Sequence, residues 1–164
     1  MLVPFDTLPT HAQVWIYQAN RALSDAETTI VNQTLGAFCQ TWDSHQQPVQ
    51  AGFALLHNRF IALAANEEMT TVSGCGIDKS VAQMRALAQQ LQVDFFDRSQ
   101  VAFWQNDTVQ TYLLAQLAQA IEKGAITAES LVFNNHLKTL GEWQNQWLQP
   151  AAQSWMARYF KQPA

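Results

Sequence analysis

The sequence predicts an α+β fold whose core is a ferredoxin-like β-α-β-β-α-β sandwich with an extra strand and a C-terminal helical, aromatic extension. Two observations lead to this prediction. The first six elements expected along the chain follow the split β-α-β order, in which two helices cover one face of a sheet. Both expected helices carry an apolar stripe at helical spacing, and the strands between and after them are joined by short turns.

The first strand and the first helix open this order. The stretch "AQVWIYQA" has bulky apolar residues from Val14 to Tyr17, which favours a strand that is covered on both faces and central in its sheet. Ser24 and Glu27 then have the spacing of a capping box. An apolar stripe follows at steps of four, three and four, so we expect a helix over roughly Asp25 to Trp42. Its members are Val31, Leu35, Phe38 and Trp42.

Two hairpins and the clearest helix of the chain come next. "VQAGFALL" and "RFIALAA" are expected to pair across His57-Asn58, because Asn tolerates the positive φ of a tight turn. "QVAFWQ" and "TVQTY" flank Asn106-Asp107 in the same way. The helix between the hairpins is predicted from one apolar face, formed by Ile77, Val81, Met84, Ala88 and Leu91.

The C-terminal extension has weaker signals. A short helix is expected to end at Gly124, and "ITAESLVFNN" is extended towards its end. Thr139 and Glu142 indicate the start of another helix, which Pro150 would stop. "SWMARYF" is compatible with a helix or a strand. Aromatic residues on the expected helical stripes fit the core better than an interface patch; they are Trp42, Trp143 and Trp147.

Length and composition limit the class of protein. The chain has 164 residues, enough for one domain with its own core and short for two. We expect a single domain over 1–164, with the sandwich core at 1–112 and the extension at 113–164 packed on it. Charged residues make up only 13%, and the formal net charge is −4 without a cluster of Lys or Arg. Nucleic acid is therefore not an expected partner.

The same features predict a cytoplasmic protein that is not inserted in a membrane. No segment reaches the roughly 18 apolar residues of a membrane span, and the N-terminus lacks the basic start and apolar stretch of a signal peptide. The two cysteines, Cys39 and Cys75, have no C-x-x-C spacing. We therefore expect no disulfide framework, no metal site and no cofactor.

The stretch "SGCGIDKS", Ser73 to Ser80, is the likeliest functional spot, because glycines, a thiol, hydroxyls and opposite charges meet where a strand leads into a helix. The candidate ligand-binding residues here are Ser73, Gly74, Gly76, Asp78, Lys79 and Ser80. A G-x-x-x-x-G-K-[ST] phosphate loop is not expected, since Ser73 and Asp78 occupy its glycine positions and the Asp78 carboxylate would repel a phosphate. These residues also have ordinary structural roles as helix caps and first-turn charges.

Cys75 is the candidate catalytic residue of this stretch. Its place before a helix favours a thiolate, yet Val81 stands where a phosphatase loop needs Arg, and Asp78 stands where a thioredoxin-like pair needs Cys. A general base would have to be a histidine from elsewhere, and no spacing selects one; the candidates are His11, His45, His57 and His136. A small, buried core residue is the favoured interpretation of Cys75.

Two further pairs are candidate ligand-binding residues. Asp97 and Arg98 precede a strand and would reach the Ser73–Ser80 stretch if the second helix folds back on its sheet, although a surface ion pair or a turn is the simpler interpretation. Asn134 and Asn135 follow an apolar segment, and their amides suit a ligand or a partner. Asn pairs also make turns without any ligand, and a turn is favoured here.

Several stretches resemble a known group of proteins. "VWIYQANRALS", "SGCGIDKS", "DFFDRSQVAF" and "LVFNNHLKT", followed by "SWMARYF", are similar to small bacterial proteins that commonly carry the label "ABC transporter ATPase". The likeness runs over nearly the whole chain. That label implies a nucleotide site, but this sequence has neither a Walker A loop nor an L-S-G-G-Q signature. The resemblance implies a family without an established activity, so no catalytic residue is transferred.

Two functional hypotheses follow. The first is a non-catalytic module that binds a protein or a small molecule, with a homodimer as one possible form, because no complete catalytic or metal constellation is found and such folds often serve binding. The alternative is a thiol-dependent enzyme for acyl or thioester chemistry, with Cys75 as nucleophile and loop amides as oxyanion donors. The alternative requires an accessible, reactive thiol, and the binding hypothesis does not.

Overall fold

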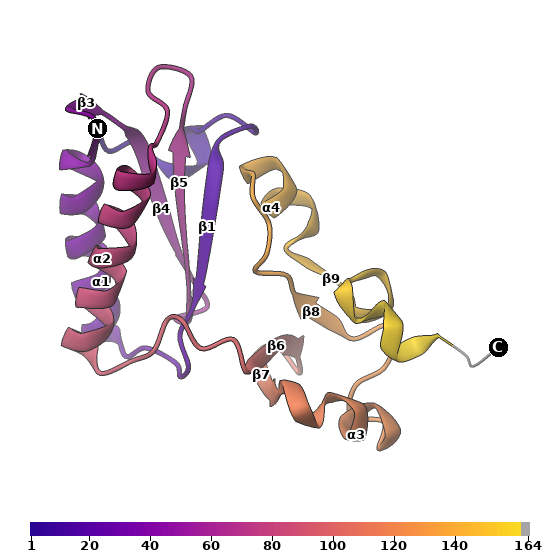
Figure 1. The fold of residues 1–164 in the computed structure, drawn as a ribbon. Coiled ribbons are helices and arrows are strands. Elements are labelled where there is room, and N and C mark those ends of the chain that lie inside the picture. The colour runs from indigo at the N-terminus through magenta and orange to yellow at the C-terminus, as the bar shows by residue number, and fades with distance from the viewer. Residues whose placement is uncertain (162–164) are drawn as a thin grey trace. The chain divides into compact units, whose positions relative to one another are not determined.

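The computed structural model describes residues 1–161, and the chain folds into two compact units (Figure 1). Unit 1 contains residues 1–97 and 136–144, and unit 2 contains residues 98–135 and the described residues from 145 onward. Helices and antiparallel sheets are both present, so the predicted α+β class is confirmed. The expected core of 1–112 spans the border between the two units, and residues 162–164 of the expected extension lie outside the described part.

Unit 1 is built on a three-stranded antiparallel sheet. Its strands are β1 (Gln13–Gln18), β4 (Gln50–Leu56) and β5 (Phe60–Asn66), in the order β1-β5-β4. The helices α1 (Asp25–Thr41) and α2 (Gly74–Leu91) lie on one face of it (Figure 1). Their buried residues form a core with alternate side chains of the strands, as period 2 requires. Both helices were predicted, and the Ser24–Glu27 capping box is present.

The second face of this sheet is also covered. The N-terminal segment with the 3-10 turn η1 (Phe5–Thr7) and the helix α4 (Leu140–Gln146) packs on it, and Leu140 is fully buried there. Gly52 of β4 permits this close approach, because a Cβ at that position would lie 2.6 Å from the Val3 carbonyl oxygen. The prediction that the first strand is covered on both faces is therefore confirmed.

The ferredoxin-like strand order is not found. β1 is an edge strand rather than the centre of the sheet, and the expected fourth strand, β6 (Gln100–Gln105), belongs to unit 2. β6 bonds β7 on one edge and β8 on the other, so it has no edge left for β1. The place beside β1 is taken by residues 138–140, where the Val14 N–H donates to the Lys138 carbonyl at 2.9 Å.

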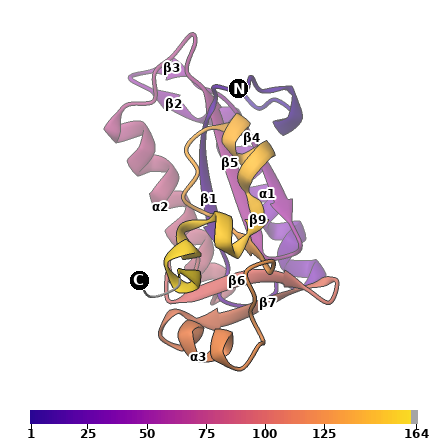
Figure 2. The same cartoon turned by 90° about the vertical axis from the view of Figure 1, so that its right-hand side faces the viewer.

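Unit 2 contains a four-stranded antiparallel sheet in the order β7-β6-β8-β9. Its other strands are β7 (Thr108–Leu113), β8 (Leu131–Phe133) and β9 (Leu148–Pro150). Figure 2 shows β6 and β7 side by side with α3 (Leu117–Glu122) beside them. Short 3-10 segments complete the unit: η2 (Leu114–Gln116), η3 (Ala151–Gln153) and η4 (Trp155–Phe160). Its core contains the fully buried Phe103 and Met156.

The turns follow the sequence closely. His57 and Asn58, and likewise Asn106 and Asp107, all have positive φ and join the predicted hairpins. A third hairpin was not predicted: β2 (Asp43–Ser44) and β3 (Gln47–Pro48) pair across two residues of positive φ. In the extension, α4 ends at Gln146 instead of being stopped by Pro150, and Pro150 closes β9.

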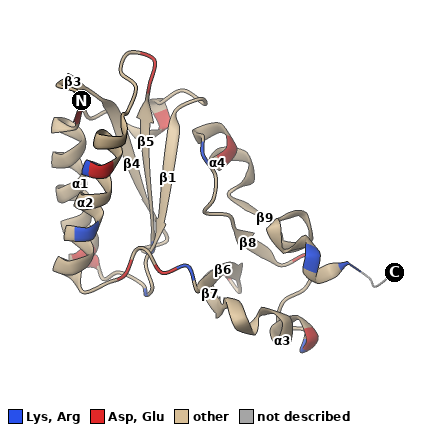
Figure 3. Ribbon diagram, viewed as in Figure 1, with Lys and Arg blue, Asp and Glu red and all other residues tan. Residues whose placement is uncertain are grey.

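Charge is sparse on both units. Figure 3 shows Lys and Arg scattered over the ribbon rather than gathered on one element, as the sequence indicates. Of the helices in residues 1–161, none has both the length and the hydropathy needed to cross a membrane.

Candidate functional site

The two ends of α2 are the regions of unit 1 in which chemically active side chains gather. The N-terminal end contains the predicted stretch, Ser73 to Ser80, which is the start of the helix and not an open loop. Ser73 is the N-cap, and its hydroxyl accepts a hydrogen bond from the Gly76 N–H at 3.2 Å. The Ser73 N–H donates to the Ser44 Oγ at 2.9 Å. The hairpin of β2 and β3 therefore fixes the start of α2.

Gly76 has a packing role at this end. Its carbonyl oxygen accepts a hydrogen bond from the Trp42 Nε1 at 3.0 Å, and Trp42 is buried beside the hairpin. A Cβ at Gly76 would lie 3.0 Å from a Val72 methyl group and 3.3 Å from the Ser44 Oγ. The glycine thus lets the first turn of α2 sit against Ser44, and it leaves no open space for a ligand there.

The charged and hydroxyl residues of the stretch are mostly engaged internally. Lys79 forms an ion pair with Asp43, and this hydrogen bond holds the pKa of the Asp43 carboxyl below its ordinary value. The Ser80 hydroxyl is buried and donates to the Ile77 carbonyl at 2.6 Å. Asp78 is exposed on the outer side of the helix, as Gly74 is. The stretch therefore contains few free groups for a ligand.

Cys75 is exposed, so its interpretation as a buried core residue is wrong. The reason is its place on the helix: the buried positions of α2 start at Gly76 and continue through Ser80 and Met84, and Cys75 precedes this stripe by one residue. Within residues 1–161 the thiol meets no hydrogen-bonding or ionic partner. Cys39, in contrast, is buried, and this burial raises the pKa of its thiol to about 12.

Asp97 is not brought to the Ser73–Ser80 stretch. Asp97 follows the C-terminal end of α2, which has 18 residues, and a helix of that length rises about 27 Å. Asp97 is the last residue of unit 1 before the chain enters unit 2 at Arg98. The alternative in which Asp97 reaches Ser73 is therefore not found, because α2 runs along the sheet and its two ends are far apart.

Asn134 and Asn135 lie in unit 2, directly after β8. The Asn134 N–H donates to the Trp147 carbonyl at 2.6 Å, and the Asn135 side-chain oxygen accepts from the Trp147 Nε1 at 3.1 Å. Both asparagines thus tie the end of β8 to the chain entering β9. This agrees with the structural interpretation of the pair that the sequence favoured.

The C-terminal half of α2 borders an open groove of about 500 Å³ that lies wholly in unit 1. Its lining comes from three segments: the turn after β1, the exposed side of α2, and the chain that follows the helix. The lining residues are Asn20, Arg85, Ala88, Gln89, Gln92, Val93, Asp94 and Phe96. None of these residues was predicted from the sequence to belong to a site.

Arg85 is the central cation of this groove. Its guanidinium carbon lies 4.6 Å above the centre of the Phe96 ring, within the range of a cation–π contact. Phe96 is in turn held by an edge-on contact with the buried Tyr17 ring at 5.7 Å between centroids. No acceptor within residues 1–161 bonds the Arg85 N–H groups. The stacked guanidinium is therefore positioned while its five donors stay available.

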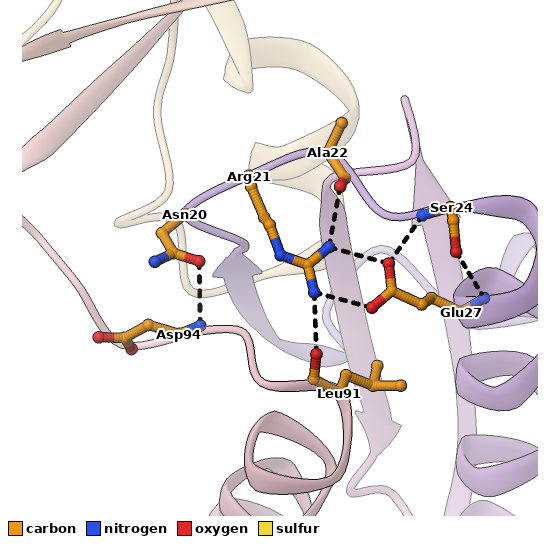
Figure 4. A network of polar contacts seen from close by, with 7 residues as sticks. All are labelled: Asn20, Arg21, Ala22, Ser24, Glu27, Leu91 and Asp94. Atoms are coloured by element: carbon orange, nitrogen blue, oxygen red, sulfur yellow. Dashed lines mark hydrogen bonds and ion pairs between the residues drawn. The ribbon is translucent and has the colours of Figure 1, made fainter.

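A polar network fixes the wall of the groove opposite α2 (Figure 4). The Asn20 N–H donates to the Asp94 carbonyl at 2.9 Å, and the Asn20 side-chain oxygen accepts from the Asp94 N–H at 3.0 Å. Next to them, Arg21 makes two hydrogen bonds of 2.8 Å to the Glu27 carboxylate and one of 2.8 Å to the Leu91 carbonyl. Arg21 therefore closes the end of α2 and is occupied, unlike Arg85.

Gln92 occupies an unusual backbone position on the groove. It is the C-cap of α2 with φ at +52°, the left-handed region in which glycine is the usual residue. Its N–H bonds the carbonyls of Ala88 and Gln89, which ends the helix. A glutamine here costs about 1 kcal/mol relative to an unstrained backbone, and its side chain lines the groove. Such strain occurs preferentially at functional sites.

Comparison of this chain with protein-family models, with curated proteins and with solved structures yields no match. Within residues 1–161, no group of three or more His, Cys, Asp or Glu side chains is placed to hold a metal ion.

The groove brings together residues that are distant in the sequence. The structure places Asn20 of "VWIYQANRALS" against Asp94 of "DFFDRSQVAF". They are 74 residues apart in the chain. The contact between them, and the place of Arg85 over Phe96, depend on the packing of α2 and have no local signature.

Proposed function

We propose that this chain is a non-catalytic binding module that takes a small molecule or a short segment of a partner protein in the groove beside α2. The observation that carries the proposal is Arg85, whose guanidinium is held on Phe96 and meets no acceptor within residues 1–161. The groove volume of about 500 Å³ falls in the usual range for ligand sites, roughly 300–1,000 Å³. A positioned, unoccupied guanidinium suits recognition of an acceptor group on a ligand.

The chemistry of the lining favours binding over catalysis. No Ser, Thr, Cys, His or Lys is among the residues that line the groove, so it offers no hydroxyl, thiol or amine nucleophile and no histidine base, and its one carboxylate, Asp94, is held by the Phe96 N–H. At the other end of α2, Cys75 has no base within hydrogen-bonding distance among the described residues. A nucleophile without a partner to take its proton is a poor catalyst.

The experiment is a ligand screen by two-dimensional ¹H–¹⁵N NMR of the whole chain. The panel contains amino acids, short peptides, dicarboxylates, polyamines and nucleotides. We expect shifts that cluster at Asn20 and at residues 85–96, and we expect Arg85→Gln to remove them. The matched control is Arg158→Gln, because Arg158 also lies over an aromatic ring, at 5.1 Å from the Tyr159 centroid, but in unit 2. Shifts confined to residues 73–80, or none, would contradict the proposal.

The exposure of Cys75 favours a second candidate function, a thiol-dependent acyl or thioester reaction with Cys75 as nucleophile. The free N–H groups of the first turn of α2 would serve as oxyanion donors. This function requires alkylation by iodoacetamide well below pH 8.5, where an ordinary thiol begins to react. Mass spectrometry reads both cysteines, with the buried Cys39 as the internal control. Reaction of Cys75 only near the ordinary pH supports the binding module instead.

A further inference from the structure

The groove carries two opposite charges that do not neutralise each other. Arg85 and Asp94 both line it, yet within residues 1–161 neither forms an ion pair. One carboxylate oxygen of Asp94, Oδ1, accepts the Phe96 N–H at 2.7 Å, which fixes the carboxylate and leaves Oδ2 for another donor. Among the described residues, neither charge has an ionic partner. Each retains the capacity to bind a group of the opposite sign.

The two charges are held by the same residue. The Arg85 guanidinium lies on the Phe96 ring, and the Asp94 carboxylate accepts the Phe96 N–H. An anionic group is thus matched at Arg85, and a cationic group is matched at Asp94.

Amide side chains occupy the groove between and beside the two charges. The side chains of Gln89 and Gln92 have no hydrogen-bond partner within residues 1–161, and both line the groove. The Asn20 side chain uses its oxygen on Asp94, so its NH₂ group is left to donate. A peptide unit needs both a donor and an acceptor partner, and glutamine amides supply both.

We infer that the ligand of this groove is a short zwitterionic peptide, with its carboxylate on Arg85 and its amino group on Asp94. This inference rests on the proposed function. A phosphate ester would place its charge against the Asp94 carboxylate, and a polyamine would place its charge against Arg85. A short peptide carries a carboxylate, an ammonium group and peptide units, which match Arg85, Asp94 and the glutamine amides respectively.

The test uses four probes that differ only in their terminal charges: triglycine, N-acetyl-triglycine, triglycinamide and N-acetyl-triglycinamide. Each is titrated into the full chain, and the Kd is taken from ¹H–¹⁵N shifts of residues 85–96. Triglycine is expected to bind most tightly. Removal of either charge weakens binding by about fivefold, the upper range for an exposed ion pair.

Two substitutions show which side chain binds each charged end of triglycine. Arg85→Gln removes the difference between triglycine and triglycinamide and keeps the difference from N-acetyl-triglycine. Asp94→Asn removes the difference between triglycine and N-acetyl-triglycine and keeps the difference from triglycinamide. The side-chain oxygen of the new asparagine still accepts the Phe96 N–H, so the turn is retained. Arg158→Gln leaves all four dissociation constants unchanged. The unperturbed spectrum of each variant away from the groove confirms that it is folded.

Equal affinity for the four probes, or no shift with any of them, overturns the inference. If other compounds of the wider panel then bind the groove in an Arg85-dependent manner, the binding module stands and only the ligand class is wrong. If the panel is silent as well, the proposed function fails together with the inference.

Discussion

The two ends of α2 differ in how their polar groups are used. At the N-terminal end, the Ser73 hydroxyl, the Gly76 carbonyl and the Lys79 ammonium all have partners inside unit 1. At the C-terminal end, the Arg85 guanidinium is held by stacking alone and the Gln92 backbone is strained. The N-terminal end of α2, which stands out in the sequence, thus stabilises the fold. The C-terminal end, which does not stand out, carries polar groups that remain available to a ligand. An unusual residue cluster can mark a structural junction.

The strongest test of this comparison is Trp42→Ala. Trp42 is 2% exposed, packs on Trp15 and Phe38, and bonds the Gly76 carbonyl, so its loss opens a cavity and frees the start of α2. We expect a loss of about 3–5 kcal/mol in the free energy of unfolding, measured by urea denaturation. Cys75→Ser is the control and should stay within about 0.5 kcal/mol. Equal effects of the two variants would contradict the structural role of this end.

Ser73→Ala tests the same end more locally. The variant loses the side-chain cap to the Gly76 N–H and the contact between the Ser73 and Ser44 hydroxyls, which are 3.0 Å apart. A loss of about 1 kcal/mol in the free energy of unfolding is expected. Ser73→Thr should recover most of it, because threonine also caps. The binding of triglycine should not change, and a change would mean that the two ends are coupled.

Gln92→Gly tests the C-terminal end of α2. Glycine adopts positive φ without strain, so stability is expected to rise, by at most about 1 kcal/mol because glycine also loses more entropy on folding. Triglycine binding should weaken, since one lining amide is removed. Gln90→Gly is the matched control inside α2, where glycine lowers stability by about 1 kcal/mol. A Gln92→Gly variant that gains stability and binds unchanged would argue against a role of this side chain.

The smallest expected effect is a pH dependence at the Arg21–Glu27 pair. Hydrogen bonds from Arg21 lower the pKa of the Glu27 carboxyl from 4.5 to about 2. A lowered pKa in the folded state contributes stability that is complete above about pH 4.5 and disappears as the pH falls towards 2. The Tm difference between the wild type and Glu27→Gln should therefore be constant from pH 5 to 7 and shrink below pH 4.5. A difference that does not vary with pH would exclude this ion pair as its source.

The local parts of the fold were predictable from the sequence. The Ser24–Glu27 capping box and the Asn106–Asp107 turn depend on residues within four positions of each other, so their signals are complete in the printed sequence. The sheet to which β6 belongs was not predictable, because it depends on pairing with β8, about 30 residues later. The same holds for the place of Thr139 beside Gln13.

The residues of the candidate sites also divide into those with a local sequence signal and those without one. The residues of the Ser73–Ser80 stretch were found because they are adjacent, but α2 starts at Gly74, inside the stretch instead of after it. The exposure of Cys75 was missed because it depends on the rotational phase of the first turn of the helix. The groove was missed because Arg85 becomes distinctive only where it lies on Phe96, eleven positions later, and lacks an acceptor.

The return of residues 136–144 to unit 1 has a consequence for how the protein is made. Unit 1 lacks the segment that pairs with β1 and the buried Leu140 until synthesis has passed residues 98–135, the first part of unit 2. The 47 residues from 98 to 144 take roughly 2–9 s to translate at the usual rates. During that interval the nascent chain has an open strand edge and an apolar sheet face that only the N-terminal segment covers, which is when general chaperones have most to bind.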